Sequence, residues 1–104
     1  MKVTLRYFDD CPGWRVADER LRIALAQVGA SAEFAYEVVD TPEKAAAVGF
    51  QGSPTVLVDG RDPFWDASLE TGLSCRLYDT GDGLEGSPSV AQLADALAID
   101  AQEA

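Results

Sequence analysis

The stretch that decides the fold is residues 2–29, KVTLRYFDDCPGWRVADERLRIALAQVG. Residues 3–7 alternate apolar with polar side chains, which is the period-two pattern of a β-strand. After a turn-rich break, apolar residues return at helical spacing from Pro12 until Gly29, which is a helix-stop residue. The stretch therefore predicts a strand, a sharp turn and a long amphipathic helix, with Cys11 at the junction.

The rest of the chain continues this alternation of strands and helices. Strands are expected at 34–38, 55–58 and 74–78, and helices at 42–48 and from 90 onward. We expect an irregular connection at 61–72, a turn-rich loop at 79–86 and a frayed tail at 99–104. The order βαβαββα predicts an α/β fold, in which a central four-stranded mixed sheet is flanked by helices.

Composition limits the classes of function. The 104 residues, of which 47% are hydrophobic, suffice for a core and predict one domain, residues 1–104. The net charge of −10 leaves no basic stripe for phosphates, so we expect no nucleic-acid partner. The sequence has no histidine, which excludes Ser/His/Asp and Cys/His catalysis and every histidine metal site.

The hydropathy pattern predicts a cytoplasmic protein that does not bind membranes. No stretch approaches the roughly 20 apolar residues of a membrane span, and the alternating N-terminus differs from a signal peptide. Two cysteines are too few for a secreted disulfide framework, so their local settings must explain them. The sequence leaves the oligomeric state open.

Cys11 is the strongest candidate for chemistry. Unpaired backbone N–H groups and the dipole at a helix start favour a thiolate, which is both a nucleophile and a soft-metal ligand. The neighbouring carboxylates of Asp9 and Asp10 oppose ionisation, so the direction of the pKa shift stays open. The alternative is a small apolar side chain buried at a turn, but a turn and a helix start favour an exposed, functional thiol.

These residues give the chain a resemblance to the thioredoxin superfamily. The resemblance rests on the strand at residues 3–8, the Cys-Pro-Gly-Trp motif at 11–14 and the Ser-Pro-Thr-Val-Leu-Val run at 53–58. It implies a thioredoxin-like fold in which Cys11 is the attacking thiol. It also implies that Pro54 is a cis-proline that faces this thiol and holds the substrate backbone.

The motif departs from the family at Trp14, which stands where a second, resolving cysteine is usual. The resemblance therefore implies a monothiol oxidoreductase that acts on protein or low-molecular-weight thiols and disulfides, with an external thiol resolving the mixed disulfide. The substrate-binding residues would be Pro12, Trp14, Ser53 and Pro54, and no metal or cofactor is expected. Trp14 also fits a plainer role, in which the indole fills space against the sheet.

Two other functions stay open at this stage. In one, the protein is a non-catalytic binding module whose Cys11 captures a soft metal, a persulfide or a partner thiol. In the other, it is an interaction domain with incidental cysteines. Arg15 either attracts an anionic thiol or is a solvated side chain, while Phe64 and Trp65 either form a partner-binding patch or anchor their loop.

Cys75 is the secondary thiol. Its segment, Gly72–Arg76, reads Gly-Leu-Ser-Cys-Arg and is similar to one in short bacterial thioredoxin-like proteins that have a Cys-Pro-x-Trp motif. The family topology implies that the fourth strand begins at the end of the sheet remote from Cys11. A disulfide needs Cα atoms within about 7 Å, so we expect no Cys11–Cys75 bond unless the irregular stretch folds back. We expect Cys75 to be buried in its strand.

Overall fold

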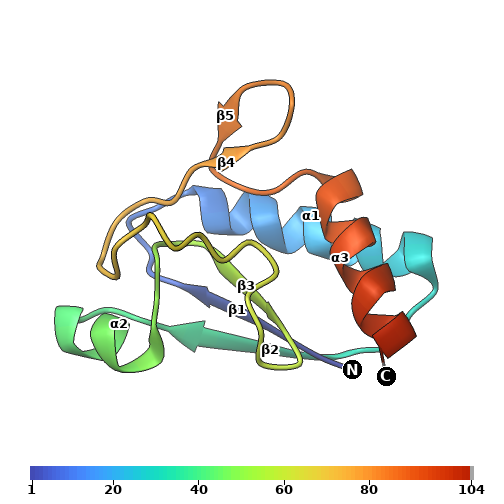
Figure 1. Ribbon diagram of the computed structural model, residues 1–104, viewed down its shortest axis with the longest axis horizontal. Coiled ribbons are helices and arrows are strands. Elements are labelled where there is room, and N and C mark those ends of the chain that lie inside the picture. Colours follow the sequence, from blue (N-terminus) through green and yellow to red (C-terminus); the bar gives the residue numbers. More distant parts are fainter. Residues whose placement is uncertain (104) are drawn as a thin grey trace.

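A computed structural model of the protein describes residues 1–103, with side chains described as far as Ile99; Ala104 lies outside the described residues. Within this range the chain forms a mixed α/β structure with three helices and two small sheets (Figure 1). The elements are β1 (Lys2–Tyr7), α1 (Gly13–Val28), β2 (Glu33–Val38), α2 (Pro42–Val48), β3 (Thr55–Val58), β4 (Tyr78–Asp79), β5 (Leu84–Glu85) and α3 (Val90–Glu103).

The central sheet has the strand order β2-β1-β3. Strand β1 runs parallel to β2, pairing Lys2 with Glu33, and antiparallel to β3, pairing Arg6 with Thr55. The start of β3 therefore lies beside the end of β1. Every residue of β3 is buried, as its short apolar, β-branched sequence predicts.

Helices α1 and α3 pack against each other and cover one face of this sheet (Figure 1). The apolar stripe of α1 and the alternate residues of β1 meet in the main core, because helical and strand periods each place these side chains on one face. Gly29 ends α1 at a φ of 67°, which a glycine adopts without a Cβ clash. The buried core residues are Val3, Leu5, Ala17, Leu21, Ala24, Val56, Val58, Leu93 and Leu97.

Helix α2 lies near the carboxyl end of β2 and buries a smaller core of Val39, Ala45 and Phe50 (Figure 1). Thr41 caps this helix, since its Oγ1 accepts a hydrogen bond from the backbone N–H of Lys44 at 3.1 Å. The expected bounds, residues 42–48, are confirmed. None of the described helices is long and apolar enough to cross a membrane.

The expected fourth strand of the central sheet, at residues 74–78, is wrong for the described structure. Cys75 makes one isolated parallel bridge with Ser53, and the chain then leaves the sheet. Tyr78 and Asp79 pair instead with Leu84 and Glu85, so the expected loop at 79–86 is a hairpin. The observed order is thus βαβαβββα, with a three-stranded sheet plus this separate hairpin in place of the expected four-stranded sheet.

The hairpin β4-β5 is tied to α1 by an ion pair. The Arg20 guanidinium lies 2.8 Å from a carboxylate oxygen of Glu85. Hydrogen bonds from Thr80 and from Arg20 hold the pKa of Glu85 below its ordinary value, since both favour the charged carboxylate. At the chain end, the tail expected to fray is helical as far as Glu103.

Candidate functional site

Cys11 and Cys75 form a disulfide bond in the structure, with an S–S distance of 2.05 Å and Cα atoms 5.6 Å apart. Our expectation that the two cysteines lie too far apart is wrong. The topology explains the error, because Cys75 pairs with Ser53 just before β3 begins. That end of β3 lies beside the carboxyl end of β1, from which the chain turns to Cys11.

The two cysteines differ in exposure, and both expectations about their burial are wrong. Cys11 is only 1% exposed, so its sulfur does not lie open to solvent. Cys75, expected in a buried strand position, is exposed. A monothiol mechanism that needs an exposed Cys11 therefore loses its main support, while the disulfide has one accessible cysteine.

The turn formed by Ser53 and Pro54 lies directly beside the disulfide. The expected cis peptide bond between these two residues is confirmed. The backbone N–H of Ser53 donates a hydrogen bond to the carbonyl oxygen of Ser74 at 2.8 Å. The backbone N–H of Arg76 donates to the carbonyl oxygen of Ser53 at 2.9 Å. The Ser53 hydroxyl oxygen also accepts a hydrogen bond from the N–H of Phe8 at 3.2 Å. Both disulfide-bearing segments are therefore anchored at Ser53.

Gly52 allows the segment that carries Cys75 to approach this turn. Its φ of 124° is one that side-chain-bearing residues rarely adopt. A Cβ added there would lie 2.9 Å from the carbonyl oxygen of Ser74 and 3.0 Å from the Cβ of Arg76. Both contacts are too close, so the 74–76 segment fits only over a glycine.

We expect Gly52→Ala to lower the free energy of unfolding by about 1–3 kcal/mol, the usual cost of a strained backbone position. It should also slow closure of the disulfide in the reduced protein, because the Ser74 carbonyl has to move. Urea denaturation and timed thiol alkylation measure the two effects. Gly72→Ala is the matched control, since its Cβ would meet nothing within 4 Å. Equal stability of the two variants would contradict this account.

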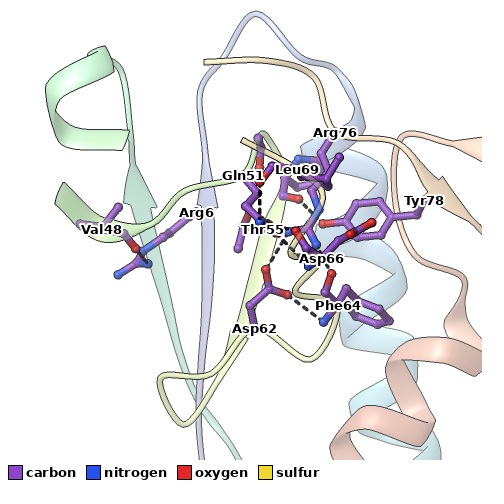
Figure 2. Close-up of polar contacts among 12 residues, drawn as sticks. Arg6, Val48, Gln51, Thr55, Asp62, Phe64, Asp66, Leu69, Arg76 and Tyr78 are labelled. Atoms are coloured by element: carbon purple, nitrogen blue, oxygen red, sulfur yellow. Dashed lines mark hydrogen bonds and ion pairs between the residues drawn. The ribbon is translucent and has the colours of Figure 1, made fainter. Parts of the chain in front are cut away.

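Arg76, the residue that follows Cys75, is buried and is held by several polar contacts. The Arg76 guanidinium lies 2.8 Å from a carboxylate oxygen of Asp62, and the two side chains are 2% and 8% exposed. It also donates to Thr55 Oγ1 at 3.3 Å and to the carbonyl oxygen of Phe64. Figure 2 shows the Arg76 side chain among these groups, which belong to β3 and to the loop that follows it.

Two further buried side chains hold the loop at residues 59–77. Gln51 donates through Nε2 to the carbonyl oxygens of Asp66 at 2.7 Å and Leu69 at 3.2 Å (Figure 2). The Tyr78 hydroxyl donates to the carbonyl oxygen of Pro54 at 2.5 Å. Burial raises the pKa of the Tyr78 phenol, which therefore stays protonated as a donor. Sequence reasoning missed these residues, because neither periodicity nor a motif marks them.

The remaining expected site residues lie at the start of α1. Pro12 is exposed and is the N-cap of α1, which begins at Gly13, one residue after the helix start expected at Pro12. Trp14 stacks on Tyr7 with ring centroids 4.2 Å apart, which confirms the plainer, space-filling role of the indole. The Arg15 guanidinium lies 5.1 Å from the centre of the Trp14 ring. Whether Pro12 or Trp14 contacts a substrate stays a prediction.

Of the aromatic pair in the irregular loop, Phe64 has the anchoring role, and a partner-binding role of Trp65 stays a prediction. Phe64 packs against the main core and meets Tyr78 edge to face at 5.6 Å, so it anchors the loop. Trp65 is 55% exposed.

A cavity of about 560 Å³ opens beside Cys75 and is lined by residues 68–77 together with Gln51. The described residues contain no group of three or more cysteine, aspartate or glutamate side chains that could hold a metal ion. The reactive group that lies beside this cavity is the Cys11–Cys75 disulfide.

Comparisons of the chain with models of protein families, with curated proteins and with solved structures found no match.

Proposed function

We propose that this chain is a thiol–disulfide oxidoreductase that works by forming and opening the Cys11–Cys75 disulfide. The observation that carries the proposal is the pairing of a buried cysteine at the start of α1 with an exposed cysteine beside the Ser53-Pro54 turn. A thioredoxin-like fold belongs to the same proposal. It is supported by the β2-β1-β3 sheet, the packing of α1 and α3, and the cis-proline.

The proposed cycle transfers two electrons between the protein and a dithiol substrate. A substrate thiolate attacks one sulfur of the disulfide, forms a mixed disulfide and releases the other protein sulfur as a thiolate. The second substrate thiol, once deprotonated, attacks the substrate sulfur of this intermediate and releases the second protein thiolate. The substrate leaves as a disulfide, and the protein holds two thiols. The reverse sequence reduces a substrate disulfide.

In this cycle Cys75, from a distant part of the chain, supplies the second thiol that is missing at Trp14. The Cys11 thiolate would form beside the start of α1, where the helix dipole favours negative charge. An internal resolving thiol closes the disulfide without waiting for an external thiol, which separates this mechanism from the monothiol one.

The decisive experiment is a redox titration of the purified protein in glutathione buffers of graded potential. Alkylation followed by mass spectrometry gives the fraction of molecules with the Cys11–Cys75 bond. An exchange-active couple should have a midpoint between about −270 and −120 mV. A midpoint below about −300 mV is typical of structural disulfides and would contradict the proposal.

The Cys75→Ser variant distinguishes the two mechanisms. With a disulfide-linked peptide as substrate, the variant should not complete turnover until an external thiol is added, because it cannot close the Cys11–Cys75 bond. Full turnover by Cys75→Ser at the wild-type rate would show that an external thiol resolves the intermediate. Cys11→Ser/Cys75→Ser is the control for uncatalysed exchange.

A further inference from the structure

The disulfide is accessible from one side only. Cys11 is 1% exposed, and the cavity beside the start of α1 is lined by Pro12, Gly13 and Val16 but not by Cys11. Cys75 is exposed and lines the cavity formed by residues 68–77. Because exchange requires that the attacking thiolate reach the sulfur it bonds, access favours attack at Cys75.

The same cavity presents apolar side chains around Cys75. Leu69, Leu73 and Leu77 line it and are 40%, 37% and 58% exposed. Leucines exposed together beside a reactive group are typical of a surface that a partner covers. A bound peptide with apolar side chains would bury these leucines and remove their apolar surface from water. A small hydrophilic thiol would leave them exposed.

Charge distinguishes further among thiols. The chain carries a net charge of −10. Of the charged residues in the cavity lining, Glu70 is exposed, while Arg76 is buried and paired with Asp62. An anionic thiol such as glutathione is repelled by this field, whereas a basic peptide is attracted. The occupant that fits both observations is a cysteine flanked by apolar and basic residues.

We infer that the substrate of the proposed oxidoreductase is a cysteine in an apolar, basic peptide segment, and that its thiolate attacks Cys75. The new bond joins the substrate sulfur to Cys75 Sγ as the bond between the two protein sulfurs breaks. The electron pair leaves on Cys11 Sγ, beside the start of α1. This inference rests on the proposed function and reverses the role first expected for Cys11, which here is the leaving group.

Trypsin allows the attacked cysteine to be identified in the unaltered protein, because the two cysteines fall in different peptides, residues 7–15 and 62–76. Oxidised protein is mixed with acetyl-Leu-Cys-Leu-Lys amide, quenched within seconds by acid and an alkylating agent, and digested. We expect at least ten times more probe on peptide 62–76 than on 7–15, with the alkyl label on Cys11. Probe mainly on 7–15 would overturn the inference but keep the proposed function.

Substrate class is tested by comparing this peptide with glutathione at equal thiolate concentration. The peptide should react at least tenfold faster with the oxidised protein. Leu73→Ser should lower the ratio of the peptide rate to the glutathione rate several-fold, because the peptide loses an apolar contact that glutathione does not make. Equal rates for the two thiols would overturn the assigned substrate class. Failure of both thiols to react, when the urea-unfolded protein does react, would instead contradict the proposed function itself.

Discussion

Reduction of the Cys11–Cys75 disulfide is expected to lower the free energy of unfolding by about 4 kcal/mol, because the bond closes a long loop in the unfolded chain. The two cysteines are 64 residues apart, and the entropy that such a crosslink removes from the unfolded state rises with loop length. Urea denaturation with and without a phosphine reductant measures the difference.

The control is the Cys11→Ser/Cys75→Ser variant, whose stability should not respond to the reductant. A difference of less than about 1 kcal/mol between oxidised and reduced wild-type protein would contradict the expectation. It would mean that the reduced chain keeps the two segments together without the bond.

The stability that the disulfide adds to the folded protein also determines how the fold shifts the redox potential of the cysteine pair. By linkage, the free energy by which the disulfide stabilises the folded protein equals the free energy by which folding stabilises the disulfide against reduction. A stabilisation of about 4 kcal/mol makes the midpoint potential of the folded protein about 90 mV more negative than that of the unfolded chain. Titrating the couple with and without urea tests this link.

Local periodicity was sufficient to predict the first half of the fold. Residues 2–29 alternate and then repeat at helical spacing, and the structure has β1 and α1 there. The short helix at 42–48 was predicted from its cap and proline, and it has the expected bounds. In these elements the side-chain pattern and the burial it implies depend on near neighbours in the sequence.

The segment around Cys75 could not be predicted in this way. We expected Cys75, which shares one face of an extended segment with Leu73 and Leu77, to be buried in its strand. The structure buries Arg76 and Tyr78 instead and exposes all three of those residues. A shift of one residue exchanges the two faces of an extended segment, and here buried polar partners, not hydrophobicity, decide which face points inward.

Those partners come from distant parts of the chain. Arg76 meets Asp62 and Thr55, while Tyr78 meets the Pro54 carbonyl. Each contact depends on the irregular loop folding back over β3, and no local pattern predicts that path. The even number of cysteines was one available signal of such a return, although it does not indicate which segment moves.

Arg76→Met is expected to lower the free energy of unfolding by about 3–5 kcal/mol, the usual cost of removing one partner from a buried ion pair. The side chains of Arg76 and Asp62 are 2% and 8% exposed, so the substitution leaves a buried carboxylate without its cation. Arg76→Lys should not restore stability, because one ammonium group cannot reach Asp62, Thr55 and the Phe64 carbonyl together. Urea denaturation of the oxidised proteins measures these differences.

Arg22→Met is the matched control for the loss of a guanidinium. Arg22 also has an ion pair, with Asp18, but its side chain is 59% exposed, so its loss should cost at most about 1 kcal/mol. Arg76→Met/Asp62→Leu should recover part of the stability lost in Arg76→Met, because it removes the stranded charge. If Arg76→Met were no less stable than Arg22→Met, the loop that carries Cys75 would have to be held by other contacts.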